Sequence, residues 1–109
     1  MLLRGAPMYG AQKEARTMKY VLLGTLGPDW AGRHAERIDQ AKGKLKELKI
    51  KLEAVLYTQG QFDFVDIVDA PSADAMLAFS VWYVKQGFGK FHSLPAFDDA
   101  AMRAALAKA

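Results

Sequence analysis

The sequence has no cysteine, which excludes a disulfide framework and any thiol chemistry. It also has no apolar run near the roughly 18 residues needed to cross a membrane, so we expect no membrane partner. A phosphate-binding glycine motif and a serine in a nucleophile elbow are absent too. These absences predict no cofactor. With no address signal recognised, a cytoplasmic location is the default expectation.

A strong excess of one charge is also lacking. The net charge is +3, and Arg4, Lys13 and Arg16 against Glu14 give residues 1–17 a charge of +2. The remainder of the chain therefore carries only +1. A nearly neutral domain does not have the basic footprint of a nucleic-acid-binding protein, so we expect no nucleic-acid partner.

The hydrophobic content is ample, at 51% of 109 residues. A chain of this length is typical of one domain, although a small domain buries a modest core and often gains stability from a partner. Residues 1–17 mix glycine, proline and charges without an apolar period, and we interpret them as a flexible N-terminal extension. Residues 18–109 then form a single domain.

Alternating and three-to-four-residue apolar spacings divide that domain into strands and helices. Asp29 and Ser72 have the residue type and position of helix N-caps, and Gln59 to Gln61 form a glycine-centred turn. The predicted order is strand 19–26, helix 30–48, strand 49–57, strand 62–69, helix 73–86, strand 90–97 and a short tail helix that is capped by Asp98 or Asp99 and ends near Leu106.

This order predicts an α+β ferredoxin-like βαββαβ sandwich with a four-stranded, largely antiparallel sheet and a short C-terminal helix. We expect the first and third strands to lie side by side at the centre, parallel to each other. Both long helices then cover one sheet face. The other face keeps apolar groups that are costly to expose, and a second copy of the same sheet would cover it.

Side-chain periodicity predicts which residues share a face of each element. Asp66 shares a face of the third strand with Phe62, Phe64 and Val68. Strict alternation in the second strand puts Ile50, Leu52, Ala54 and Leu56 on one face. The buried stripes are predicted to be Ala31, Ala35, Ile38, Ala41, Leu45 and Leu48 on the first helix, and Ala73, Met76, Leu77, Ser80, Val81 and Val84 on the second, widened by Phe79, Trp82 and Tyr83.

Three segments together resemble the GYD domain family. They are Lys19-Tyr-Val-Leu-Leu-Gly24, Lys51-Leu-Glu-Ala-Val-Leu-Tyr-Thr58, and Gly60-Gln-Phe-Asp63 followed by Val65, Ile67, Ala70 and Pro71; Leu94-Pro-Ala-Phe97 is also similar to the family's last strand. The resemblance covers Met18 to Phe97. Gly60 and Asp63 match the Gly, Tyr, Asp motif, while Phe62 replaces the tyrosine and lacks its hydroxyl.

The resemblance implies a fold and an assembly, without catalytic residues. GYD proteins are similar to the dimeric α/β-barrel group, in which two ferredoxin-like sheets pair. Some members of that group are cofactor-free oxygenases with an Asn, Trp and His set, which a chain without asparagine cannot assemble. Gly60 supplies a positive φ for the turn, and Asp63 accepts hydrogen bonds from backbone amides or pairs with a cation.

Neither histidine predicts a metal site. His34 has no ligand partner four residues along its helix, and the strand aspartates Asp63, Asp66 and Asp69 alternate between two faces and cannot converge on one ion. His92 is the best single candidate for proton transfer, because histidine alone titrates near neutrality unaided. A histidine whose ring is satisfied by a backbone carbonyl is the plainer alternative.

Two functions therefore stay open, and the sequence does not decide whether the protein is an enzyme. The first is a homo-oligomeric binding or interaction module that pairs through its open sheet face. The second is a cofactor-independent enzyme or binder of a small apolar ligand, with an apolar pocket between sheet and helices. The residues expected to line that pocket are Tyr20, Tyr57, Phe64, Trp82 and His92.

Overall fold

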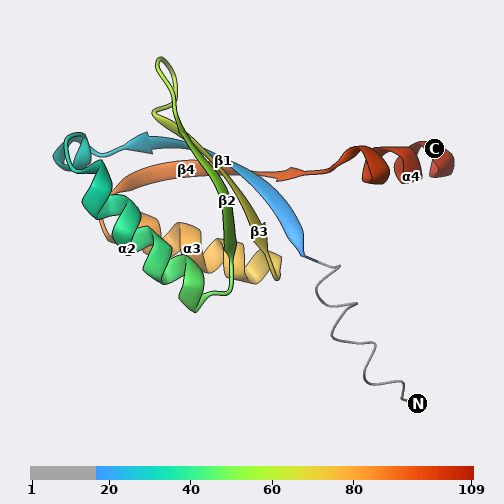
Figure 1. Cartoon of the computed structure of the whole chain (residues 1–109), viewed down its shortest axis with the longest axis horizontal. Coiled ribbons are helices and arrows are strands. Elements are labelled where there is room, and N and C mark those ends of the chain that lie inside the picture. The colour runs from blue at the N-terminus through green and yellow to red at the C-terminus, as the bar shows by residue number, and fades with distance from the viewer. Residues whose placement is uncertain (1–16) are drawn as a thin grey trace, which may run out of the picture.

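The computed structural model describes residues 17–109, so the predicted extension lies almost entirely outside the described residues. The elements are β1 (Met18–Leu26), the 3-10 turn η1 (Pro28–Trp30), α2 (His34–Glu47), β2 (Lys51–Tyr57), β3 (Phe64–Ala70), α3 (Ala73–Lys85), β4 (Gly89–Ala96) and α4 (Asp99–Lys108). Figure 1 shows α2 and α3 packed together on one side of the sheet and α4 extended away from it. The predicted α+β, ferredoxin-like arrangement is confirmed.

The four strands form one sheet in the order β2-β3-β1-β4, and each neighbouring pair is antiparallel. The expectation that the two central strands β1 and β3 run parallel is wrong. The helix crossover through α2 does join two parallel strands, but these are β1 and β2, and β3 is inserted between them. The same holds for β3 and β4, which are separated by β1.

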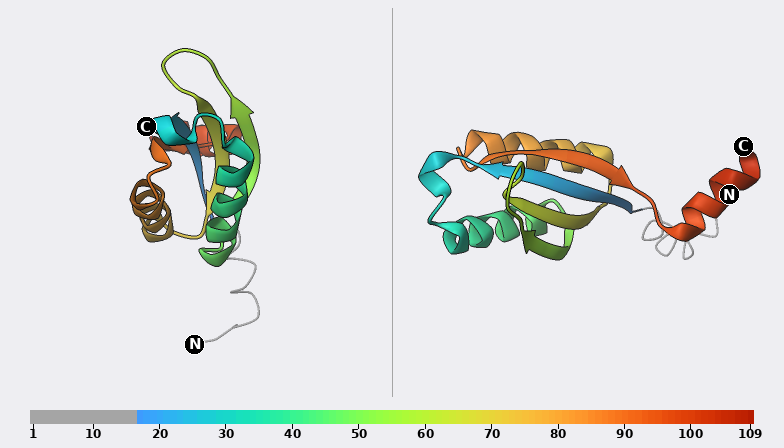
Figure 2. Two further views of the ribbon diagram at one scale, coloured as in Figure 1. Left: turned by 90° about the vertical axis from the view of Figure 1, so that its left-hand side faces the viewer. Right: turned by 90° about the horizontal axis from the view of Figure 1, so that it is seen from above.

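The strand register divides the side chains between two faces. Tyr20, Leu22 and Gly24 of β1 pair with Val68, Asp66 and Phe64 of β3. These residues face the helices and are buried. Figure 2 shows from two further directions that α2 and α3 cover this face alone. The core therefore lies between one sheet face and two helices, and the opposite face is left open.

Helix α2 begins later than the spacing predicts. Pro28 to Trp30 form the 3-10 turn η1, and Arg33 takes the N-cap position of α2 without a capping side chain. Asp29 therefore lies inside the turn and does not cap the helix. Ala31 and Ala35 are exposed, whereas Arg37, Ala41 and Leu45 are buried. Gly32 lies between the turn and α2, and the buried stripe of α2 includes Arg37 in place of the two alanines.

Helix α3 buries its aromatic side instead of its aliphatic side. Ser72 caps it as predicted, with its Oγ accepting from the Ala75 amide at 3.1 Å. Met76, Phe79 and Tyr83 are the buried residues. The expected stripe residues Leu77, Val81 and Val84 are instead 51–64% exposed. Large rings bury more apolar area than branched aliphatic chains, which accounts for the choice of face.

Strand β2 contains a register shift between Leu52 and Ala54. Leu52 pairs with Val68 on the helix-covered face, but Ala54 pairs with Ile67 on the open face. The bulge inverts the alternation predicted for this strand. Leu56 consequently lies on the open face, and Tyr57 lies on the helix side opposite Phe64.

Helix α4 is capped by Asp98, whose Oδ1 accepts from the Ala101 amide at 2.9 Å. None of its residues is buried. Phe97, Met102 and Leu106 expose 77%, 56% and 67% of their surface. The tail helix thus forms as predicted but packs little against the domain body (Figure 1).

Candidate functional site

The open sheet face carries two rows of side chains that cross all four strands and are apolar except for one histidine. In the first row the paired residues are Ala54, Ile67, Val21 and Leu94, in the order β2-β3-β1-β4. In the second row they are Leu56, Val65, Leu23 and His92. Within residues 17–109, these rows are covered neither by α2 and α3, which pack on the other face, nor by α4. We call the two rows the open-face patch.

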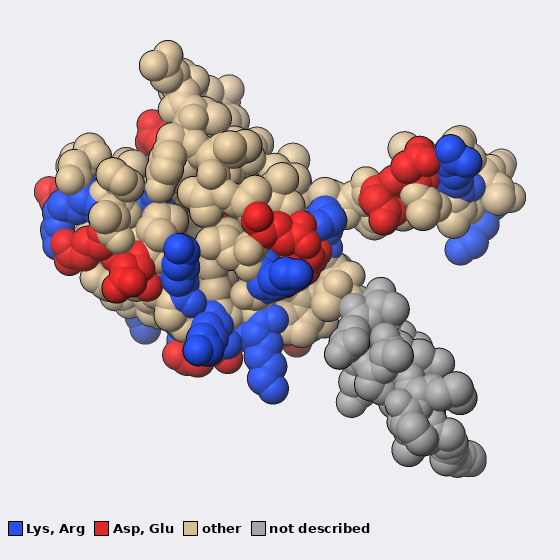
Figure 3. All heavy atoms as spheres, viewed as in Figure 1, with Lys and Arg blue, Asp and Glu red and all other residues tan. Residues whose placement is uncertain are grey.

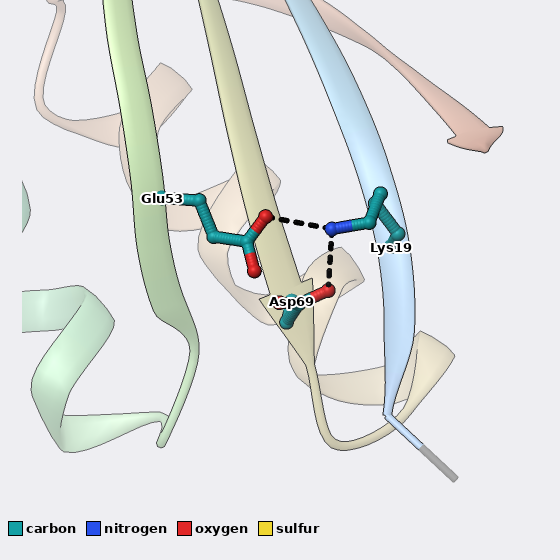
Figure 4. A network of polar contacts seen from close by, with 3 residues as sticks. All are labelled: Lys19, Glu53 and Asp69. Carbon is teal, nitrogen blue, oxygen red and sulfur yellow. Dashed lines mark hydrogen bonds and ion pairs between the residues drawn. The ribbon is translucent and has the colours of Figure 1, made fainter. Parts of the chain in front are cut away.

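A three-residue ionic network borders the open-face patch. Lys19 Nζ lies 2.6 Å from Glu53 Oε1 and 3.2 Å from Asp69 Oδ1. Figure 4 shows the three side chains meeting from β1, β2 and β3. The contact with Asp69 and the lysine lowers the pKa of Glu53, and the contact with Glu53 raises the pKa of Asp69. The β2 bulge therefore brings two carboxylates to one lysine.

His92 lies on the open face and is exposed. Its ring meets Phe62 edge-on, with centroids 5.7 Å apart. It is thus separated by the sheet from the space between sheet and helices. The predicted proton-transfer candidate and the predicted pocket lie on opposite faces.

The β2–β3 loop is fixed by backbone and side-chain contacts of the Gly-Phe-Asp segment. Gly60 has a φ of 105°, the positive value expected for it. Asp63 donates from its amide to the Gly24 carbonyl at 2.7 Å and accepts at Oδ2 from the Leu26 amide at 2.8 Å. Thr58 Oγ1 donates to the Phe62 carbonyl at 2.6 Å. These residues hold the loop against the end of β1.

A buried polar cluster lies beneath α2 and α3. Arg37 is 1% exposed, Asp66 9% and Tyr83 2%. Arg37 Nη1 donates to the Tyr83 hydroxyl at 3.0 Å, and the guanidinium carbon lies 4.8 Å from the centre of the Phe64 ring. Nε and Nη2 of Arg37 and Oδ1 of Asp66 have no hydrogen-bond partner within the described chain. Buried polar atoms without partners are uncommon and costly.

The buried surroundings of the cluster raise the pKa values of two of its residues, Asp66 and Tyr83. Burial raises the pKa of Asp66 to about 6, and the positive charge of Arg37 opposes this shift. Burial also raises the pKa of Tyr83 to about 12, so its hydroxyl keeps its proton at neutral pH. Perturbed carboxyls of this kind gather at functional sites, which makes the cluster the second candidate region.

Two further polar rings lie toward the surface from this cluster. His34, the first residue of α2, meets Tyr57 of β2 edge-on at a centroid distance of 5.6 Å. Both residues are exposed. Tyr57 pairs with Phe64 across β2 and β3, and Phe64 contacts Tyr83 with centroids 6.2 Å apart. A series of polar and aromatic groups thus connects the surface with Arg37.

The five residues expected to line a pocket are not brought together. Tyr20 and Phe64 are core residues, 5% and 1% exposed. Trp82 is half-buried against Phe79 and Phe88. Tyr57 lies at the surface on the helix side, and His92 lies on the other face, as described above. Tyr20 and Phe64 also point away from the open face, where an RNA-recognition sheet would present its aromatics.

Sequence reasoning missed the Arg37 cluster. The apolar spacing leaves Arg37 out of the buried stripe of its helix. It includes Tyr83 in a buried stripe only as an aromatic residue, with no role for the hydroxyl. The signal for Asp66 was available, because alternation put it on the same strand face as Phe64 and Val68. A carboxylate among such neighbours needs a buried partner once the helices cover that face, and the choice of that partner depends on the rotation of α2.

Other site classes find little support in the described part of the chain. Lys and Arg are interspersed with Asp and Glu on the surface seen in Figure 3. Residues 17–109 contain no group of three His, Cys, Asp or Glu side chains placed to hold a metal ion. Among the same residues, helices of the length and hydropathy needed to traverse a bilayer are lacking.

Comparisons with known proteins agree with the resemblance seen in the sequence. The model of the GYD domain family matches residues 20–106 and so includes most of α4. Searches of curated proteins and of solved structures gave no match. The match includes all or most of every strand and helix described above, and the chain belongs to the GYD domain family.

Proposed function

We propose that the protein is a homo-oligomeric interaction module that forms a two-fold dimer through the open-face patch. The observation that carries this proposal is the pair of apolar rows on a sheet face that the described chain leaves uncovered. Burying apolar area is worth roughly 25 cal/mol per Å², so a contiguous patch of this kind favours a partner.

Charge at the border of the patch favours a second copy as that partner. Lys19 carries one sign, and Glu53 and Asp69 carry the other, within one network. A surface that bears both signs is complementary to itself under a two-fold axis. A partner that is strongly acidic or strongly basic has no such match here.

A single charge in the patch tests the dimer. Ile67 lies on the central strand β3 and pairs with both Val21 and Ala54. In the dimer, an Ile67→Lys substitution would bury an unpaired ammonium group in the interface, which is unfavourable. We therefore expect this variant to be a monomer by light scattering at tens of micromolar, a concentration at which we expect the wild type to be a dimer. Val84→Lys is the matched control, because Val84 is 55% exposed on α3, away from the sheet.

The outcomes separate cleanly when folding is followed by circular dichroism. A folded monomer for Ile67→Lys and a dimer for Val84→Lys support the proposal. A monomeric wild type at this concentration contradicts it. Dissociation by Val84→Lys together with retention by Ile67→Lys would place the interface on the helices instead.

A second candidate function is binding of a small molecule between sheet and helices. The observation that favours it is the set of unpartnered polar atoms on Arg37 and Asp66. This function does not depend on the dimer, because both side chains lie in the core between the sheet and the helices, away from the open-face patch. Titration of small polar compounds into labelled protein tests it, with resonances near Arg37 as the readout.

A further inference from the structure

The arginine of the buried cluster presents one specific edge. Nη1 of Arg37 is occupied by the Tyr83 hydroxyl. The unpartnered nitrogens are Nε and Nη2. These two nitrogens lie along one side of the planar guanidinium, and their N–H bonds are parallel. Such an edge binds the two oxygens of a carboxylate in a bidentate manner.

The aspartate of the cluster requires the opposite kind of group. Oδ1 of Asp66 is a buried acceptor without a donor. Tyr83 accepts from Arg37, which leaves its own proton available to a further acceptor. The free groups are therefore donors on Arg37 and Tyr83 and an acceptor on Asp66. A molecule that satisfies all of them offers oxyanion oxygens on one side and a hydroxyl on the other.

We propose that the Arg37–Tyr83–Asp66 cluster is a binding site for a small hydroxycarboxylate. The ligand carboxylate bridges Nε and Nη2 of Arg37, and the ligand hydroxyl donates to Oδ1 of Asp66. The proposal rests on the second candidate function, the binding of a small molecule between sheet and helices. It adds the chemical class of that molecule.

Charge supports the choice of an anion. Arg37 lies over the Phe64 ring and has the Tyr83 hydroxyl as its hydrogen-bond partner, neither of which is charged. Asp66 forms no hydrogen bond with Nε or Nη2 of the guanidinium, and these two nitrogens keep no partner within the described chain. A ligand carboxylate supplies a charged acceptor for both of them.

Three matched three-carbon probes test the proposal in the full chain. L-Lactate has both groups, propionate lacks the hydroxyl, and lactamide lacks the carboxylate. We expect saturable shifts at the Arg37 Nε–H resonance in a ¹H–¹⁵N spectrum titrated with lactate. A hydrogen bond to a charged acceptor corresponds to about a tenfold effect or more, so propionate should bind about tenfold more weakly than lactate. Lactamide should bind more weakly still.

Substitutions within the cluster test whether the lactate-induced resonance shifts come from binding at Arg37, Tyr83 and Asp66. Arg37→Gln should weaken lactate binding by about a hundredfold, and Tyr83→Phe, which keeps the ring packing, by several-fold. Asp66→Asn should reduce the difference between lactate and propionate. Arg33→Gln is the matched control, because Arg33 is exposed and paired with Glu36 at 2.9 Å; its lactate affinity should equal that of the wild type.

Each remaining outcome is decisive. If lactamide shifts the Arg37 resonance and lactate does not, small-molecule binding stands and the hydroxycarboxylate class is wrong. If no probe shifts it, and a crystal structure grown with lactate shows water alone on Arg37 and Asp66, both the class and the binding function are wrong. If Arg37→Gln unfolds, Tyr83→Phe and Asp66→Asn carry the same test.

Discussion

Asp63 Oδ2 accepts a hydrogen bond of 2.8 Å from the amide of Leu26, a residue 37 positions earlier in the chain. Leu26 is the last residue of β1, where the strand hydrogen bonds end. The Asp63 amide donates to Gly24 at the same strand end. One residue of the family motif therefore attaches the β2–β3 loop to a central strand by two bonds.

Replacement of Asp63 by alanine should remove the side-chain bond and leave a partly buried amide unpaired. We expect the free energy of unfolding to fall by about 1–3 kcal/mol in urea denaturation. Asp39→Ala, at an exposed position of α2, is the control and should change it by less than about 0.5 kcal/mol. Equal effects of the two substitutions would show that the Leu26 contact contributes nothing to stability.

The order of the elements follows from the sequence because each strand and helix has its own apolar period and its own stop signal. Ser72, Pro71 and Gly60 act locally, and their roles as cap, strand end and turn could be predicted. Strand pairing is not local. The antiparallel β1–β3 pair arises because β3 inserts between β1 and β2, which periodicity does not report.

The candidate site was harder to predict than the fold because it depends on helix rotation and on a bulge. Arg37 is buried because it lies on the side of α2 that meets the sheet, and the apolar spacing of the helix does not include it. Tyr57 lies near His34 only because the Leu52–Ala54 shift inverts the alternation of β2. Each is a tertiary adjustment of one residue or one turn.

Gly24 should not tolerate a side chain. A Cβ built at this position would come within 1.9 Å of the Phe64 ring, which lies across the paired strand. Gly24→Ala must displace that ring from the core, so we expect a loss of about 1–3 kcal/mol of unfolding free energy. Chemical denaturation measures it, and a loss below about 0.5 kcal/mol would contradict the ring position.

Gly43 gives the opposite expectation. It lies within α2, and a Cβ there meets nothing within 4 Å. Because alanine has the higher helix propensity, Gly43→Ala should raise the free energy of unfolding by about 0.5–1 kcal/mol. A destabilising effect in the same assay would indicate that this side of α2 contacts a further segment or a partner.

Helix α4 should be dispensable for the stability of the domain. It buries none of its residues, and a ten-residue helix is marginal in water without tertiary contacts. A chain ending at Phe97 should unfold within about 0.5 kcal/mol of the full chain when both carry Ile67→Lys, which removes any dimer contribution. A larger loss would show that α4 packs on its own domain.

Asp66 should make stability fall as pH rises. Burial raises its pKa to about 6 from an ordinary 3.8, so the folded protein holds this proton more tightly than the unfolded chain. The contribution of this proton to the free energy of unfolding is fully present below about pH 4, decreases between about pH 4 and 6, and is lost at neutral pH. Over that interval the wild type should lose about 2–3 kcal/mol relative to Asp66→Asn, which does not titrate.

Urea denaturation of both proteins from pH 4 to pH 7 isolates this effect, because the other titrating groups, including Glu53 and Asp69, are common to both. Arg37 is the charge that opposes the shift. If it paired fully with an ionised Asp66, the difference between wild type and Asp66→Asn would be flat or would reverse its sign. Addition of lactate then provides a second comparison, since a carboxylate on Arg37 competes with ionised Asp66 and should move the pH interval upward.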